Sequence, residues 1–264
     1  MINPFRNIRL SLPSEMRTGK YLKYAIGEIF LVVIGILIAV NINNWNENRK
    51  TRTIEVNYLR NIQADLNTEL KNNDSYIKEH NQKAILGYNL MTTPVGKTKS
   101  EQLNLDMKRH YVHGWKNFIP TNNTFKELIS SGQLNSISSD SIKYYLLEID
   151  KIYASIANSE HHMRREYEKY LYDISVPNTA LFNNINFDET LTTKMISTTD
   201  SSQISDNQFL KMQEDFIWLR NNQTYQNGLK LAVLNNLYIN TRHQLLTVNI
   251  NRLNRLISEE IKKN

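Results

Sequence analysis

The segment IFLVVIGILIAV, residues 29–40, is the one long apolar run of this 264-residue chain. Alone it would form about 18 Å of helix, at about 1.5 Å per residue, which is shorter than a hydrocarbon core of roughly 30 Å. Extending the segment to Tyr24 and Ile42 gives about 28 Å of helix and takes in Glu28 and Asn41. The flanks therefore have to join the run before it can span a bilayer.

We interpret residues 24–43 as one transmembrane helix. Tyr24 and Trp45 lie where interfacial aromatic residues are expected, and basic residues precede them. A cleaved signal peptide is one alternative, but it needs small residues before the cut, and the positions around Ala39 offer no A-x-A pattern. A buried core helix is the other alternative, although the basic-then-aromatic flank is typical of a membrane anchor.

The distribution of charge predicts the orientation and the partners. Residues 1–23 contain five Lys or Arg and one acid, whereas the segment of similar length after the span contains four Lys or Arg. This bias favours a cytoplasmic basic tail, an inner (cytoplasmic) membrane anchor and a periplasmic domain over residues 44–264. Outside the tail the net charge falls from +6 to +2, too little for a phosphate-binding face, so we expect a lipid bilayer and no nucleic acid as partners.

Glycine and proline placement predicts an all-α chain. Breakers are rare in three long stretches and collect between them. The expected long helices cover about 45–90, 136–174 and 203–262, and the expected shorter helices cover about 99–110 and 122–131. No terminator separates the span from the first long helix, so we expect a continuous stalk that leads into an antiparallel helical bundle. Strands have little room except in residues 175–195.

Each long stretch carries one apolar stripe at three- and four-residue steps. In the first stretch the stripe consists of Leu59, Ile62, Leu66, Leu70, Asn73 and Ile77. In the middle stretch it consists of Ile142, Tyr145, Leu146, Ile149, Ile152, Tyr153 and Ile156. In the last stretch, a strict 3-4-3-4-3 spacing predicts a coiled-coil seam against partner helices, made of Leu231, Leu234, Tyr238, Thr241, Leu245 and Val248.

Two segments carry distinctive motifs. The first contains YAIGEI at 24–29, LVVIGILIA at 31–39 and INNWNE at 42–47, and the second is FKELISSGQL at 125–134. Together they resemble an uncharacterised family of single-span membrane proteins common in Bacteroidota. The resemblance implies an inner-membrane protein with a helical outer domain. It implies no activity and no catalytic residues.

The span holds two candidate features. Glu28 is an ionisable group near one end, where it marks either an ion or proton path or an ordinary contact with headgroup water. Small residues at four-residue steps let helices approach closely, which makes one stripe a candidate helix–helix interface. This stripe consists of Gly27, Leu31, Gly35 and Ala39.

Outside the span we find no catalytic, cofactor or metal signature, and we expect no enzyme. The chain lacks cysteine and the common nucleotide, hydrolase and zinc-protease motifs. His162 and Glu166 could share a metal on one helix face, but no second pair matches them. The remaining candidates are His110 and His113, near a loop, and His80 and His243, which are isolated in the sequence.

The aromatic loop over residues 111–120 is either a recognition surface, with Trp115 and Phe118, or a set of core anchors. The leading functional hypothesis is a membrane-anchored periplasmic interaction or scaffold module that binds another protein or itself. The alternatives are a ligand-binding bundle that signals through the span, and an accessory subunit of an ion-driven or transport complex that uses Glu28.

Overall fold

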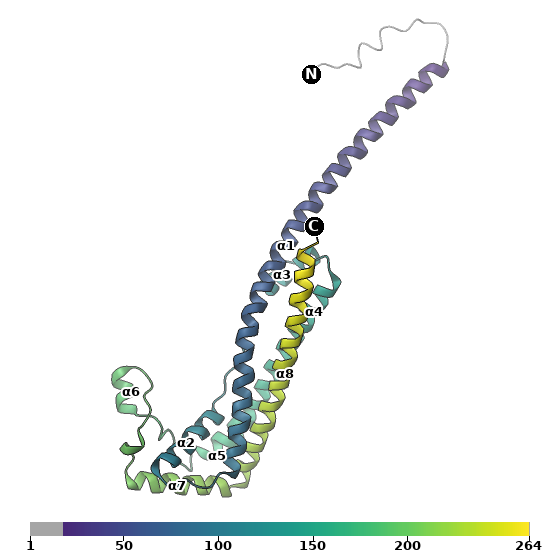
Figure 1. Ribbon diagram of the computed structural model, residues 1–264. Helices are drawn as coiled ribbons and strands as arrows, with labels where there is room; N and C mark the ends of the chain where they lie inside the picture. The colour runs from purple at the N-terminus through teal and green to yellow at the C-terminus, as the bar shows by residue number, and fades with distance from the viewer. Residues whose placement is uncertain (1–17, 264) are drawn as a thin grey trace. The chain divides into compact units, whose positions relative to one another are not determined.

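A computed structural model describes residues 18–263, with side chains from Tyr24 onward (Figure 1). Most of the basic tail predicted over residues 1–23 therefore lies outside the described residues. The chain divides into two compact units, residues 1–55 and 56–264. Helix α1 (Thr18–Thr92) contributes to both units, so the predicted span and stalk belong to one continuous helix.

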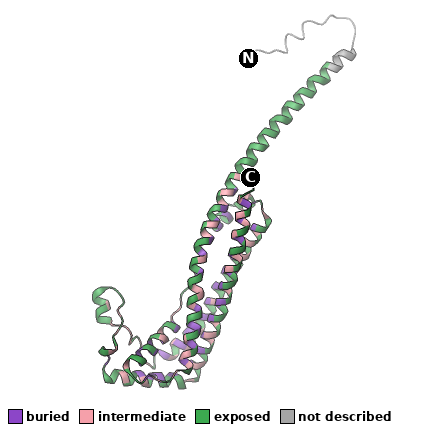
Figure 2. Cartoon of the chain, viewed as in Figure 1, coloured by how far each residue is buried: buried purple, intermediate pink, exposed green. Residues whose placement is uncertain are grey.

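Within the first unit, the apolar part of α1 from Tyr24 to Ile42 has no protein cover. Every described side chain from Tyr24 to Thr51 is exposed, as the unbroken green of this part of the helix shows (Figure 2). Among the described residues, α1 is the one helix that is long and apolar enough to cross a membrane. An apolar helix without a polar face and without a packing partner is suited to lipid contact.

The regular secondary structure of the second unit is helical. Its helices after α1 are α2 (Lys99–His113), α3 (Asn123–Ser130), α4 (Asp140–Tyr167), α5 (Asp173–Ser175), α6 (Phe187–Thr193), α7 (Asp206–Asn221) and α8 (Gln223–Ile261). The described residues contain no strand, and an isolated bridge joins Ile185 to Thr198 near the segment where strands had room. The all-α prediction is confirmed.

Three helices form the bundle of this unit: α4, α8 and the part of α1 that follows Val56. Gln63 Nε2 of α1 donates to Ser258 Oγ near the end of α8 at 2.8 Å, and Asn73 Nδ2 donates to Thr247 Oγ1 at 2.8 Å. Increasing numbers in α1 thus pair with decreasing numbers in α8, which runs antiparallel to α1 and α4 (Figure 1).

The stripes predicted on the first and middle stretches form the core. Leu59, Ile62 and Leu66 of α1 are buried against six of the seven predicted residues of α4, and Tyr145 packs at the edge of that core. Helix α8 contributes a continuous apolar face to the same cluster. This face, which we call the inner face, includes Leu246, Ile250, Leu253 and Ile257.

The seam predicted on the last stretch lies on the other side of α8. Leu234 is 62% exposed and Val248 is 64% exposed, and Tyr238 and Leu245 are also exposed. At about 100° per residue these positions point away from the inner face, so the helices of the bundle do not cover them. The prediction that this stripe packs against helices of the same bundle is wrong, because a different set of α8 residues makes that contact.

The predicted helix over 203–262 is divided at Asn222. Asn222 has φ −82° and ψ 110°, outside the helical region, and its side chain accepts a hydrogen bond from Tyr225 N at 3.0 Å. An asparagine in this position caps a new helix as well as ending the previous one. The division was missed because only glycine and proline were treated as breakers.

The middle helix also differs in detail from the predicted range of 136–174. Ser139 caps α4 at its start, and a π-helical turn, Glu168–Tyr172, joins α4 to α5. Gly228 of α8 lies against this turn, since a Cβ there would sit 2.9 Å from Tyr170 O. The close approach therefore requires glycine at this position.

Candidate functional site

The candidate residues of the span lie on an exposed helix. Glu28 and the four residues of the small stripe, Gly27, Leu31, Gly35 and Ala39, are all exposed. A Cβ built at Gly27 or Gly35 meets nothing within 4 Å, so the backbone is open along this side. A helix–helix interface at this stripe and a role for Glu28 both stay predictions.

The aromatic loop splits between surface and core. Phe118 is 6% exposed and packs edge-on against Tyr76 and His243, with ring centroids 5.1 and 5.0 Å away. Trp115 is half-buried, and the Arg164 guanidinium lies 4.6 Å from its ring centroid. Phe118 therefore packs in the core, and a recognition surface at this loop stays a prediction.

Two acidic side chains of α1 bind the backbone that follows the aromatic loop. Glu69 Oε2 accepts from Thr121 N at 2.6 Å, and Asp65 Oδ2 accepts from Thr124 N at 2.9 Å. Burial raises the pKa of Glu69, while the hydrogen bonds from Thr121 oppose that rise. These carboxylates satisfy the backbone N–H groups of the loop at Thr121 and of the first turn of α3 at Thr124, so their role is structural.

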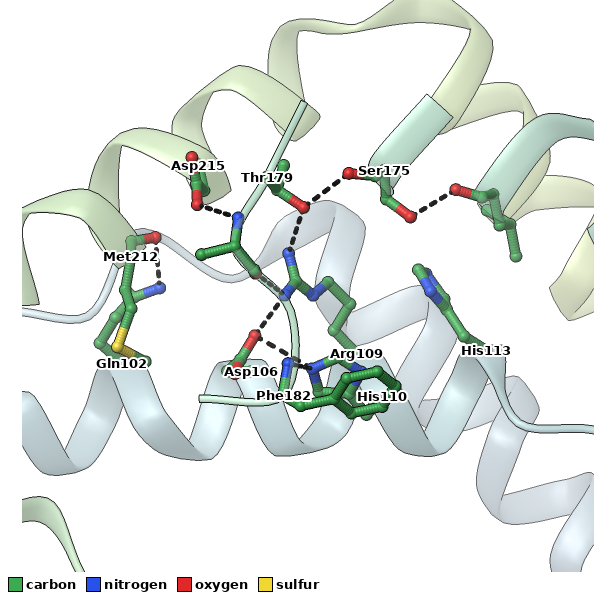
Figure 3. Close-up of polar contacts among 12 residues, drawn as sticks. Gln102, Asp106, Arg109, His110, His113, Ser175, Thr179, Phe182, Met212 and Asp215 are labelled. Atoms are coloured by element: carbon green, nitrogen blue, oxygen red, sulfur yellow. Dashed lines mark hydrogen bonds and ion pairs between the residues drawn. The ribbon is translucent and has the colours of Figure 1, made fainter. Parts of the chain in front are cut away.

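A second polar cluster forms hydrogen bonds with the backbone of the segment after α5 (Figure 3). Arg109 of α2 donates to Asp106 Oδ1 at 2.5 Å and to Ala180 O at 3.1 Å. Asp215 of α7 accepts from Ala180 N at 2.8 Å. Because both the N–H and the carbonyl of one residue are held by charged side chains, the cluster fixes the path of a segment that has no regular structure.

The histidines named in the sequence have different surroundings. His110 stacks on Phe182 with ring centroids 4.7 Å apart, and the Nε2 atom of buried His113 lies 2.9 Å from Tyr225 Oη. His162 and Glu166 form a side-chain pair at 3.0 Å, with His162 54% exposed. The last pair is the surface contact expected from i, i+4 spacing.

Three buried side chains meet inside the bundle: His80 of α1, Glu160 of α4 and His243 of α8. They are 4%, 2% and 0% exposed, and a ligand atom from each lies within 4.8 Å of the others. We call this group the buried centre. His80 and His243 were treated as isolated in the sequence, and the structure corrects this, because the antiparallel packing of α8 on α1 brings them together with their rings stacked at 5.5 Å.

The buried centre has perturbed proton affinities. Burial raises the pKa of Glu160 to about 7, although hydrogen bonds from Phe118 N act in the opposite direction. Burial, with a smaller contribution from His80, lowers the pKa of His243 to about 3. The pKa of His80 is also lowered, again mainly by burial. Both imidazoles are therefore neutral at pH 7, which is the state in which they can bind a metal.

A weak signal for the buried centre was present in the sequence. His80 is the next three-residue step after Ile77 on the α1 stripe, and Glu160 is the next four-residue step after Ile156 on the α4 stripe. A polar residue in line with an apolar stripe is expected to be buried. The sequence could not reveal which helices face each other, so it could not place the two residues together.

The exposed stripe of α8 borders a surface groove. The stripe, which we call the outer stripe, consists of Leu234, Tyr238, Leu245 and Val248. The groove has a volume of about 520 Å³, runs between α4 and α8, and includes Tyr238 and Asn235 in its wall. On the α4 side it is lined mainly by short side chains, which are Ala154, Ser155, Asn158 and Ser159.

Comparison with known proteins gives a family match. The model of a family of unknown function (DUF6090) matches residues 28–222, which covers the apolar end of α1 and all helices through α7. No curated protein matches the chain. No solved structure matches it either.

Proposed function

The chain belongs to the family of unknown function DUF6090, which supplies no activity, and we propose from the geometry that it is a membrane-anchored helical interaction module rather than an enzyme. The anchor is the exposed apolar part of α1. The contact surface is the outer stripe of α8 with the adjoining groove. The partner is an amphipathic helix, from a second copy of this chain or from another protein.

The observation that carries the proposal is the outer stripe. Its residues keep the spacing of a coiled-coil seam, yet Leu234 and Val248 are more than 60% exposed in the folded unit. Burying a leucine side chain contributes roughly 1.5–3 kcal/mol, so an uncovered seam offers a partner helix a substantial gain. The short side chains along the α4 wall of the groove leave room for such a helix to approach.

The proposed location is the inner membrane, with the tail in the cytoplasm and the bundle in the periplasm. Five basic residues in the first 23 favour retention of that segment inside. A chain with alkaline phosphatase fused after its C-terminal residue should be active in a bacterial host only if the bundle is exported. An inactive fusion at normal expression would reverse the proposed orientation.

Site-specific crosslinking in native membranes tests the contact. The chain contains no cysteine, so Val248→Cys introduces a single thiol for a photoactivated crosslinker on the outer stripe. We expect a discrete adduct at the mass of two chains or of the chain plus one protein. Asn251→Cys is the matched control, because Asn251 is exposed on the same helix and lies outside the stripe.

A negative crosslinking result would contradict the proposed function. If Val248→Cys gives no adduct above the Asn251→Cys background, the outer stripe is not a contact surface and the proposed function is wrong. If an adduct forms, adding Leu245→Lys to the Val248→Cys chain should abolish it, because a charged group at a packed seam position is costly.

A further inference from the structure

The histidine of α1 has a defined tautomer in the buried centre. His80 Nδ1 lies 2.8 Å from Asn236 Oδ1. The amide nitrogen of Asn236 donates to Tyr167 Oη at 2.8 Å and to Ala232 O at 2.7 Å, which fixes its oxygen toward the histidine. A carbonyl oxygen only accepts, so the hydrogen-bond network assigns the proton to His80 Nδ1 and leaves the lone pair on Nε2.

The histidine of α8 repeats this arrangement with a different asparagine. His243 Nδ1 lies 2.6 Å from Asn73 Oδ1, and the amide nitrogen of Asn73 donates to His243 O and Thr247 Oγ1, both at 2.8 Å. The proton is again on Nδ1. His243 Nε2 is buried and has no hydrogen-bond partner among the described residues. Leaving such an atom unpaired in the core is unfavourable, which calls for a ligand.

The third member, Glu160, supplies a carboxylate oxygen. Both oxygens of Glu160 share one donor, the N–H of Phe118, at 3.0 and 2.9 Å. A carboxylate can accept about four hydrogen bonds or bind a cation, so most of its capacity is unused. The nearby charges Glu79, Lys83 and Lys116 are paired with one another, with Lys83 Nζ 2.9 Å from Glu79 Oε1.

We propose that His80, Glu160 and His243 bind one divalent transition-metal ion, with Zn²⁺ the favoured ion, through the two Nε2 atoms and a carboxylate oxygen. Two histidines and one glutamate are an established zinc donor set, and they leave a fourth position open. Asn73 and Asn236 orient the imidazoles as outer partners do in metal sites. Ca²⁺ and Mg²⁺ prefer all-oxygen sites and fit this donor set poorly.

The test is zinc binding by the full chain. The protein is purified in detergent, and bound metal is removed with a chelator. It is then titrated with Zn²⁺ in competition with a chromogenic chelator. The titration is repeated after mild urea treatment, because the site is buried and the metal needs access to it. We expect one equivalent per chain and a higher unfolding midpoint with Zn²⁺ than without it. His80→Ala and His243→Ala should each weaken binding by at least about 100-fold, since loss of an outer partner alone costs about 10- to 100-fold.

Two further variants separate a specific site from surface binding and from misfolding. His162→Ala removes the exposed histidine paired with Glu166 and should leave the affinity unchanged. Asn73→Ala keeps all three ligands and should weaken binding by about 10- to 100-fold, with the far-ultraviolet circular dichroism of the helices retained. A wild-type chain that takes up no Zn²⁺ overturns the proposal, and so does unchanged affinity in a folded His243→Ala chain.

Discussion

The inner face and the outer stripe of α8 have similar composition and opposite surroundings. Leu246, Ile250, Leu253 and Ile257 on the inner face are 0% exposed, whereas Leu234 and Val248 on the outer stripe are 62% and 64% exposed. Both sets recur at three- and four-residue steps along one helix. The difference teaches that periodicity identifies an apolar face, while its role depends on what the fold places against it.

We propose that the two faces divide stability from interaction. A leucine removed from water contributes roughly 1.5–3 kcal/mol, so the inner face holds α8 on α1 and α4. The outer stripe contributes little to the folded unit alone. Apolar residues that stay in solvent along a regular seam are then available for binding.

The largest effect should come from neighbouring leucines on the two faces. Leu246→Ala removes a side chain that is 0% exposed and should lower the free energy of unfolding by about 2–5 kcal/mol, because it leaves a cavity in the core. Leu245→Ala, one residue away and 42% exposed, should cost less than about 1 kcal/mol. Urea unfolding of both full-length variants, followed by circular dichroism, measures the difference. Equal losses would show that the two faces are equally packed.

The next effect concerns the point where the buried side of α8 meets the π-helical turn. Gly228→Ala would place a Cβ 2.9 Å from Tyr170 O and from Leu171 Cδ2, and should destabilise by about 1–3 kcal/mol through overpacking. Thr224→Ala, at an exposed position of the first turns of α8, should change stability by less than about 0.5 kcal/mol. The same urea measurement applies. A stable Gly228→Ala chain would mean that the turn relaxes away from α8.

Much of this fold follows from local patterns. The stripes of α1 and α4 were predictable because Leu59, Ile62 and Ile149 belong to apolar series that repeat at helical spacing. The break at Asn222 was not predictable from glycine and proline alone. Its cause is a side-chain cap, which many asparagines in this sequence could form.

The buried centre shows where local patterns end. His80 and His243 are separated by most of the domain, and only the register of α8 against α1 brings them together. A one-turn shift of that register would separate His243 from Asn73 as well as from His80. Long-range register depends on the packing of whole faces, so a single sequence does not supply it.

A third prediction concerns the pH dependence of stability that arises from His243, the residue of the buried centre that lies on α8. The pKa of His243 falls from an ordinary 6.5 to about 3 on folding, so the unfolded chain takes up a proton below pH 6.5 and the folded chain does not. This group therefore leaves the free energy of unfolding unchanged above pH 6.5 and lowers it increasingly as pH falls toward 3. At pH 5 the loss is about 2 kcal/mol.

The comparison with His243→Gln isolates this contribution, because other groups titrate nearby. The pKa of Glu160 is raised to about 7, so its titration favours the fold as pH falls, and the pKa of His80 is lowered, which acts in the same direction as His243. The titrations of Glu160 and His80 occur both in the wild-type chain and in His243→Gln. Between pH 7.5 and 5, with a chelator present, wild type should lose about 2 kcal/mol more unfolding free energy than His243→Gln. Parallel pH profiles would show that His243 is not held neutral.

The smallest effect on stability should accompany the largest effect on association. Val248→Lys adds a charge at a position that is 64% exposed, so the unfolding free energy should change by less than about 0.5 kcal/mol. In a Leu245→Cys background the same substitution should remove the crosslinked product, because a partner helix would have to bury the charge. Asn251→Lys adds the same charge outside the stripe and should leave the product intact. A variant that loses association while keeping its stability separates the outer stripe from the inner face, whereas loss of both would make the two faces parts of one core.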